Sequence, residues 1–210
     1  MSSIKNLEKI NKSSYHKYGK IVVYGGQFNP IHSGHEMVAS EVNATIQPDH
    51  FYFMPSFMSP LKKHDELIEV EHRIQMVKLV IENLGFGTLR LDEIERKGQS
   101  YTYDTLLNIR QESPDAKLFF VIGTDQYEQL DRWYEIDALK SFVTFVVVNR
   151  GAVIQSDDDA IMMVNIPEMA ISSTEIRQRR SQQQTIHMWV PLNVEHYILK
   201  EGLYGSNICD

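Results

Sequence analysis

Short, continuous apolar runs alternate with helical patterns from Lys20 onward, and this alternation constrains the fold more than any other feature of the chain. Runs of this kind are typical of strands that are buried on both faces of a parallel sheet. Helices between such strands form right-handed crossovers. The pattern therefore predicts an α/β chain with a doubly wound, mainly parallel sheet and helices on both faces. The expected strands are 21–24, 51–54, 88–91, 118–122, 142–148 and 162–166, and the expected helices are 36–45, 70–83, 103–112 and 136–140.

Residues 1–18 are polar, with lysines among serines and asparagines, and no apolar stretch of a secretory signal follows them. We interpret them as a leader, either disordered or a short amphipathic helix, and residues 19–210 as a single domain. Apolar runs are too short for a membrane span, which needs roughly 18 residues.

Composition narrows the class of protein further. Cys209 is the only cysteine, so no internal disulfide can form, which fits a cytoplasmic location. The net charge of −7 argues against a general nucleic-acid-binding surface. The sequence leaves open whether the chain forms a homo-oligomer.

A glycine turn with two histidines joins the first expected strand to the first expected helix: residues 25–35 read GGQFNPIHSGH. Glycines let a backbone approach a ligand, and the start of a helix offers unpaired N–H groups and the positive end of a dipole, which favour phosphate. His32 and His35 stand three residues apart, so both can face one ligand. The alternative is a plain strand–loop–helix connection with two solvent-exposed histidines.

A second motif, ISSTEIR, occupies residues 171–177. Ser172 and Glu175 have the spacing of a capping box, which predicts a helix start there. Its hydroxyls and N–H groups could hold phosphate oxygens, and the planar guanidinium of Arg177 suits phosphate. The alternative is a capped surface helix whose arginines at 177, 179 and 180 are solvated. With both motifs present, we favour two helix N-termini that converge on one polyphosphate.

Together these motifs resemble those of the HIGH superfamily of nucleotidyltransferases, and the chain is more narrowly similar to the bacterial nicotinate-nucleotide adenylyltransferases. The likeness runs from Lys20 to Tyr204. It implies a Rossmann-like fold and a transfer of the adenylyl group of ATP to nicotinate mononucleotide. The products would be nicotinate adenine dinucleotide (deamido-NAD) and pyrophosphate, in NAD biosynthesis. It also implies Mg²⁺, held mainly through the phosphates of ATP.

The resemblance implies a set of catalytic and ATP-binding residues. His35 would donate to the α-phosphate in the transition state, and His32, Lys62 and Arg177 would support the phosphates. The acceptor phosphate is ionised near neutral pH, so alignment and charge stabilisation would suffice without a general base. The expected ATP-binding residues are Gly25, Gly26, Phe28, Ile171, Ser172, Ser173, Thr174, Gly123 and Asp125.

The pyridine substrate has its own implied site. The segments SYTYDT at 100–105 and RWY at 132–134 resemble segments of the adenylyltransferases. Trp133 would stack on the pyridine ring, backbone N–H groups of Thr102 and Tyr134 would receive the carboxylate, and Tyr101 would lie beside them. The alternative for Trp133 is a half-buried packing residue.

One loop departs from the family. Many members have Pro-Pro-His-Lys where this chain has Ser-Pro-Leu-Lys at 59–62, so leucine replaces the usual histidine before Lys62. Lys63 or His64 could share the role of Lys62 near the phosphates. The downstream His72 and Arg73 match a family helix and are expected to serve structure.

Four rival functions remain. Pantetheine-phosphate adenylyltransferases share the opening motif but leave the SYT and WY segments unexplained. An adenylyltransferase that prefers the amide mononucleotide is closer, because one loop contact can alter that choice. Class I aminoacyl-tRNA synthetases use a related signature, but this chain lacks a Lys-Met-Ser-Lys-Ser loop and the length for an anticodon-binding domain. A nucleotide-binding sensor without catalysis would bind ATP without turnover.

Overall fold

The structure, a computed structural model, describes residues 19–56, 68–96, 101–150, 156–167 and 169–205. The predicted leader, residues 1–18, lies outside these ranges, and so do Lys62, Lys63 and His64. The division into a leader and one domain therefore stays a prediction.

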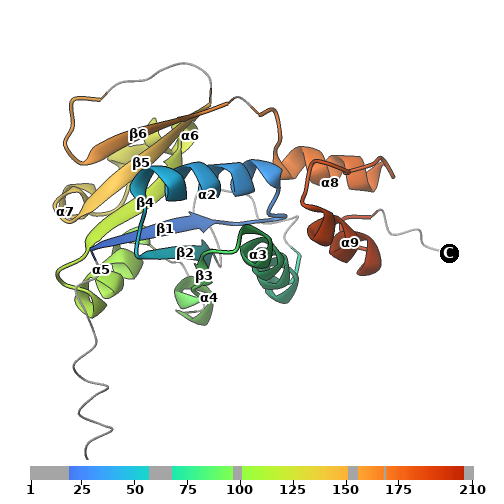
Figure 1. Ribbon diagram of the computed structural model, residues 1–210, viewed down its shortest axis with the longest axis horizontal. Coiled ribbons are helices and arrows are strands. Elements are labelled where there is room, and N and C mark those ends of the chain that lie inside the picture. Colours follow the sequence, from blue (N-terminus) through green and yellow to red (C-terminus); the bar gives the residue numbers. More distant parts are fainter. Residues whose placement is uncertain (1–18, 57–67, 97–100, 151–155, 168, 206–210) are drawn as a thin grey trace, which may run out of the picture.

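Six parallel strands form one sheet within the described residues, in the order β3-β2-β1-β4-β5-β6 (Figure 1). The strand order reverses between β1 and β4, and doubly wound sheets bind ligands at the carboxyl ends of the strands beside such a reversal. The Rossmann-like α/β fold expected from the sequence is confirmed. The strands are β1 (Lys20–Gly26), β2 (His50–Pro55), β3 (Thr88–Leu89), β4 (Lys117–Gly123), β5 (Val143–Arg150) and β6 (Ile161–Ile166).

Helices cover both faces of this sheet because the strands alternate their buried side chains. In β1, Val22 and Tyr24 pack against α2 and α3, whereas Ile21 and Val23 pack against α5 and α7. No helix in the described ranges is long and apolar enough to cross a membrane. The helices are α2 (Ser33–Ile46), α3 (Val70–Leu84), α4 (Asp92–Arg96), α5 (Thr102–Glu112), α6 (Thr124–Tyr127), η1 (Leu130–Arg132), α7 (Ile136–Lys140), α8 (Ser173–Ser181) and α9 (Leu192–Lys200).

The described structure differs from the sequence expectation at β3 and α9, and the short helices α4, α6 and η1 were not expected either. The strand expected at 88–91 is shorter, because the N–H of Glu95 already bonds to the Leu91 carbonyl at 2.9 Å and begins the turn of α4. Helix α9 was not expected at all. Its buried Val194 and Ile198 share the helix with exposed Leu192 and Leu199, which blurs the apolar stripe that would reveal it.

Helix α4 carries a buried carboxyl, Glu93, which is 8% exposed. The pKa of Glu93 is raised from the ordinary 4.5 to about 7, mainly by burial. The positive charge of Arg96 lowers this pKa in part, and the negative charge of Asp92 raises it. The folded state therefore holds a proton that the unfolded chain loses, and stability falls as the pH rises from about 4.5 to about 7. Above about pH 7, this difference in pKa lowers the free energy of unfolding by about 3 kcal/mol.

We expect Glu93→Gln to raise the free energy of unfolding at about pH 8 by up to about 3 kcal/mol, and by much less at about pH 5. Urea unfolding at the two pH values measures this. Glu95→Gln, on the exposed side of the same helix, is the control and should change neither value. An equal effect of Glu93→Gln at both pH values would contradict a buried carboxyl that titrates near neutrality.

Candidate active site

The two histidines lie at the start of α2, directly after the carboxyl end of β1. The backbone N–H of His32 donates to Nδ1 of His35 at 3.2 Å, and the two rings lie 3.7 Å apart. Since Nδ1 accepts, the proton of a neutral His35 sits on Nε2, which makes that atom a donor. The local backbone thus selects the tautomer of His35.

The two histidines differ in burial. His32 is 3% exposed, whereas His35 is half-buried and packs edge-on against the Phe28 ring at 5.2 Å. A Cβ at Gly34 would come within 3.1 Å of the His32 ring, so glycine leaves the space that this ring fills. His35 is therefore the histidine that is more open to a ligand.

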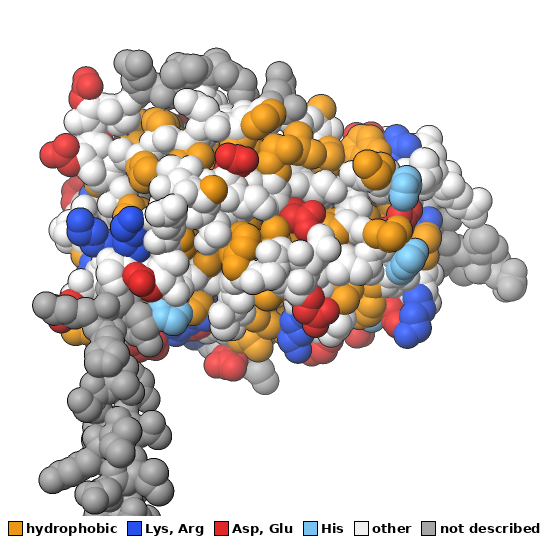
Figure 2. All heavy atoms as spheres, in the orientation of Figure 1, with side chains coloured by type: hydrophobic (Ala, Val, Ile, Leu, Met, Phe, Trp, Pro, Cys, Tyr) orange, Lys and Arg blue, Asp and Glu red, His pale blue; other side chains and the backbone are white. Residues whose placement is uncertain are grey.

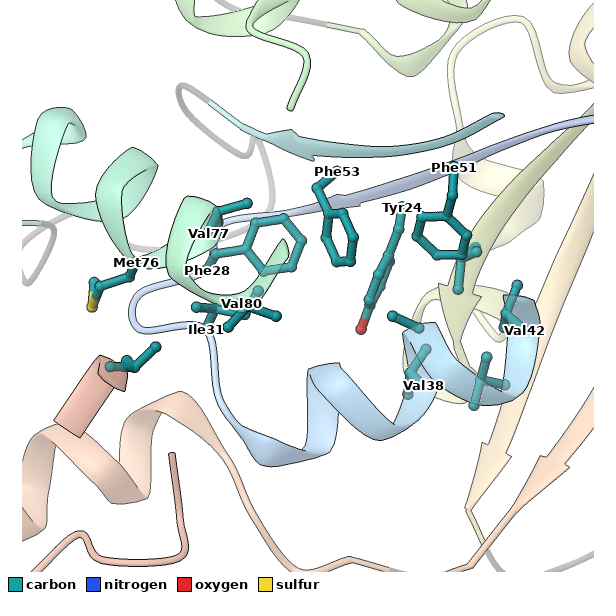
Figure 3. Packing of buried hydrophobic residues seen from close by; sticks show 14 of the residues in the cluster. Tyr24, Phe28, Ile31, Val38, Val42, Phe51, Phe53, Met76, Val77 and Val80 are labelled. Carbon is teal, nitrogen blue, oxygen red and sulfur yellow. The ribbon is translucent and has the colours of Figure 1, made fainter. Parts of the chain in front are cut away.

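The histidine loop, which we define as residues 27–32, begins with an unfavourable backbone conformation. Phe28 has φ 48°, in the left-handed region that side chains rarely adopt, and such residues cost about 1–3 kcal/mol. Its ring is 2% exposed and lies beside Phe53 in the core, as Figure 3 shows. Burial of the ring offsets the backbone cost, because a buried Phe gains about 1.5–3 kcal/mol.

Side chains from distant elements hold the carbonyls of the histidine loop. Arg73 of α3, 2% exposed, donates to the carbonyls of Gln27 and Ser56 at 2.7 and 2.8 Å. Burial lowers the pKa of the Arg73 guanidinium, and the nearby Tyr204 and Glu71 oppose only part of this shift. The Arg73 side chain still remains charged, as arginines in proteins do. The structural role expected for Arg73 is thus visible as a clamp on the loop.

The second motif meets the first at the histidine loop. Ser172 caps α8, its Oγ accepting from the N–H of Glu175 at 3.1 Å, as the capping-box spacing predicted. Arg177 donates to the carbonyl of Asn29 at 3.0 Å, and Ser173 Oγ donates to the carbonyl of Pro30 at 2.9 Å.

The start of α2 also lies beside Ile171. A Cβ at Gly34 would stand 4.0 Å from the Ile171 carbonyl oxygen. Thr174 is exposed, with Oγ1 accepting from the Arg177 guanidinium at 3.4 Å. The structure therefore brings the starts of α2 and α8 together. The Arg177 guanidinium there is hydrogen-bonded to Asn29 and Thr174.

The predicted glycines lie at the ends of the two central strands. Gly25 and Gly26 end β1, and Gly123 ends β4. The N–H of Gly123 donates to Gln126 Oε1 at 3.1 Å, and Asp125 in the first turn of α6 is exposed. Gly123 and Asp125 are exposed at the edge where the sheet reverses its strand order, whereas Gly25 and Gly26 are half-buried there.

The predicted pyridine-binding residues gather on the α5 side of the sheet. Thr102 begins α5, the Tyr101 and Tyr134 rings lie 4.8 Å apart, and Tyr134 is 52% exposed. Tyr103, which the sequence did not single out, contacts the Tyr134 ring edge-on at 5.9 Å. The structure thus groups three tyrosines from α5 and the segment after η1.

Trp133 packs against aromatic side chains of β4 and β5. Its ring is half-buried and contacts Phe120 and Phe145 edge-on at 6.1 and 6.0 Å. A Cβ at Gly25 would come within 3.2 Å of Phe120, so the Phe120 ring lies beside both Trp133 and the end of β1. The buried Trp133 Nε1 has no hydrogen-bond partner among the described residues. Its packing and its predicted stacking role are compatible, because only part of the ring is covered.

Metal ligands are not clustered in this region. Across the described ranges, no group of three or more His, Cys, Asp or Glu side chains could hold a metal ion.

Comparison with known proteins gives the family. A cytidylyltransferase-like family model matches residues 23–179, well over half of the 210-residue chain, and the chain belongs to this family of nucleotidyltransferases. The match includes both motifs and confirms the superfamily that they predicted.

Solved structures of three related chains have the same fold. A Plasmodium falciparum nicotinic acid mononucleotide adenylyltransferase complexed with NaAD is 24% identical, with a TM-score of 0.75 over 89% of this chain and 98% of that one. The P. falciparum enzyme complexed with APC is 25% identical, with a TM-score of 0.74 over 90% and 98%. A provisionally named nicotinate-nucleotide adenylyltransferase from Vibrio parahaemolyticus is 23% identical, with a TM-score of 0.67 over 90% and 98%.

Proposed function

We propose that this protein transfers the adenylyl group of ATP to nicotinate mononucleotide, which gives nicotinate adenine dinucleotide and pyrophosphate in NAD biosynthesis. The observation that carries the proposal is the meeting of the starts of α2 and α8 at the histidine loop, next to His35, whose Nδ1 accepts from the His32 N–H. The family match and the similarity to adenylyltransferases along about nine tenths of the chain support it.

The reaction needs alignment and charge stabilisation rather than a base. An oxygen of the acceptor phosphate attacks the α-phosphorus of ATP, and the bond from that phosphorus to the bridging oxygen breaks as pyrophosphate leaves. His35 Nε2–H donates to an α-phosphate oxygen as charge develops on it. Because the His32 N–H occupies Nδ1, the donor on Nε2 is set before ATP arrives.

Further residues support the phosphates in this proposal. His32, Arg177 and Lys62 offset phosphate charge, with Lys63 or His64 as alternatives to Lys62. ATP would lie along the two glycine ends and the start of α8, and Mg²⁺ held mainly by its phosphates would offset charge on the leaving pyrophosphate. The proposed ATP-binding residues are Gly25, Gly26, Phe28, Ile171, Ser172, Ser173, Thr174, Gly123 and Asp125.

The α5 side of the sheet supplies the proposed pyridine site. Trp133 offers the face of its ring to the pyridine, and the N–H groups of Thr102 and Tyr134 receive the carboxylate. Tyr101, whose ring contacts Tyr134, closes the site from the side. One cysteine and a net charge of −7 favour a cytoplasmic enzyme for small molecules rather than a nucleic-acid-binding protein.

Pyrophosphate release with ATP and Mg²⁺ tests the function, with nicotinate mononucleotide, nicotinamide mononucleotide and phosphopantetheine supplied separately. Strong preference for the first is the expected result. Preference for the amide would keep the reaction but overturn the roles of Thr102 and Tyr134. Activity with phosphopantetheine alone, or ATP binding without release, would overturn the proposed function.

We expect Trp133→Ala to raise KM for nicotinate mononucleotide roughly 5–150-fold, because stacking on an aromatic face contributes about 1–3 kcal/mol per base. KM for ATP should change by less than about threefold. Steady-state kinetics with each substrate varied in turn measures both constants, and Trp133→Phe should restore most of the affinity. Equal increases in the two KM values would mean that Trp133 only packs against Phe120 and Phe145.

A further inference from the structure

The part of the chain beyond the family match returns to the histidine loop. The family model ends at residue 179, and α9 and Tyr204 follow it. Figure 1 shows α8 and α9 at the end of the sheet to which β1 points. The N–H of Ser33 donates to the Trp189 carbonyl at 3.0 Å, and Ser33 Oγ donates to the Met188 carbonyl at 3.1 Å.

Tyr204 bonds to a residue within the histidine loop itself. Its hydroxyl donates to Oδ1 of Asn29 at 2.9 Å, across 175 residues of sequence. Asn29 is 4% exposed, and its carbonyl accepts from Arg177. Burial raises the pKa of the Tyr204 hydroxyl well above its usual range, which the charges of Arg177 and Arg73 only partly oppose. The hydroxyl therefore stays protonated and keeps donating throughout the neutral range.

Asn29 occupies a critical place in the loop. It follows Phe28, whose left-handed backbone is unfavourable, and it lies three residues before His32, whose N–H sets the tautomer of His35. Arg177 holds the backbone of Asn29 and Tyr204 holds its side chain. A shift of Asn29 would move the His32 N–H relative to the His35 ring, and a misplacement of about 1 Å at a reacting group can cost about 10²-fold in rate.

We propose that Tyr204 is a positioning residue of the adenylyl transfer: its hydroxyl fixes Asn29, and through the histidine loop it fixes the donor tautomer of His35. This inference rests on the proposed function. It assigns to the end of the chain a task that neither motif performs.

The chain offers a matched control. The Tyr197 hydroxyl, on α9, is hydrogen-bonded to Nδ1 of His72 on α3 at 2.8 Å, and Tyr197 makes no hydrogen bond to the described residues of the histidine loop. Tyr204→Phe and Tyr197→Phe each remove one hydroxyl from the same C-terminal region. If Tyr204 only docks this region, both variants should behave alike.

The first test compares turnover in the full chain. We expect Tyr204→Phe to lower kcat about tenfold or more while KM for ATP changes less than about twofold, and Tyr197→Phe to change both less than about twofold. Thermal unfolding should show both variants folded. Equal kcat values for Tyr204→Phe and the unchanged protein would overturn the proposal, and so would equal losses in the two variants.

The second test does not depend on activity. Long-range ¹H–¹⁵N spectra of the histidine rings report the tautomer, with the His35 signals assigned from their loss in His35→Gln. We expect one Nε2–H form in the unchanged protein and in Tyr197→Phe, and a mixture in Tyr204→Phe. An unaltered His35 pattern in Tyr204→Phe would overturn the positioning role. Absence of adenylyl transfer in the unchanged protein would instead overturn the proposed function and leave this spectral test decisive.

Discussion

Replacing His35 with alanine is expected to lower kcat about 10²–10³-fold, which is the usual cost of removing one preorganised transition-state donor. KM for ATP should change much less, because the donor acts on charge that develops during the reaction. In the structure the His32 N–H donates to Nδ1 of His35, so the proton of a neutral His35 ring sits on Nε2. Single-turnover measurement of pyrophosphate release separates the chemical step from substrate binding.

A surface histidine provides the control for His35. Histidine side chains lie at the surface over the α8–α9 end of the molecule (Figure 2), and His196 of α9 is exposed. His196→Ala removes the same side chain away from the proposed reaction and should keep normal turnover. Near-normal kcat in a folded His35→Ala protein would exclude the histidine from the mechanism.

The local parts of the site were predictable because each depends on a short segment. The apolar runs around Val22, Phe53 and Phe120 read as strands since both faces of the sheet are buried, and all three lie in the sheet. The capping-box spacing of Ser172 and Glu175 gave the start of α8 correctly. In the sheet, β1 lies beside β4, at the position where the strand order of a doubly wound sheet reverses.

The supports of the site were not predictable, because they depend on contacts between residues far apart in the chain. Nothing near Tyr204 signals that its hydroxyl reaches Asn29. The carbonyls that Arg73 holds belong to a turn and a strand end that only the folded chain places together. The predicted roles of Lys62, Lys63 and His64 remain predictions outside the described residues.

The arginines of α8 separate the two interpretations of this helix that the sequence left open. Arg177 donates to Asn29 and to Thr174 beside the histidine loop. Arg179 instead donates to the Thr185 carbonyl at 2.8 Å, and its guanidinium lies 4.7 Å from the centre of the Trp189 ring. The two residues carry the same charge on one helix, yet only Arg177 borders the proposed phosphate site.

We therefore expect Arg177→Ala to lower kcat/KM for ATP about 10²-fold or more. A hydrogen bond to a charged group contributes about 1.5–3 kcal/mol, and loss of the Asn29 anchor adds misalignment of the loop. Arg177→Lys should recover part of this loss, because it keeps the charge but not the planar fork that bonds to two groups at once.

Arg179→Ala is the matched control, since it removes an equal charge and an equal packing side chain from α8. We expect its kcat/KM to stay within about threefold of the unchanged protein. Steady-state kinetics at two ionic strengths distinguishes local contact from general charge, because a salt-screened field would affect both variants alike. Equal, small losses in the two variants would mean that α8 presents a solvated basic face, and the convergence of two helix starts on the polyphosphate would then be wrong.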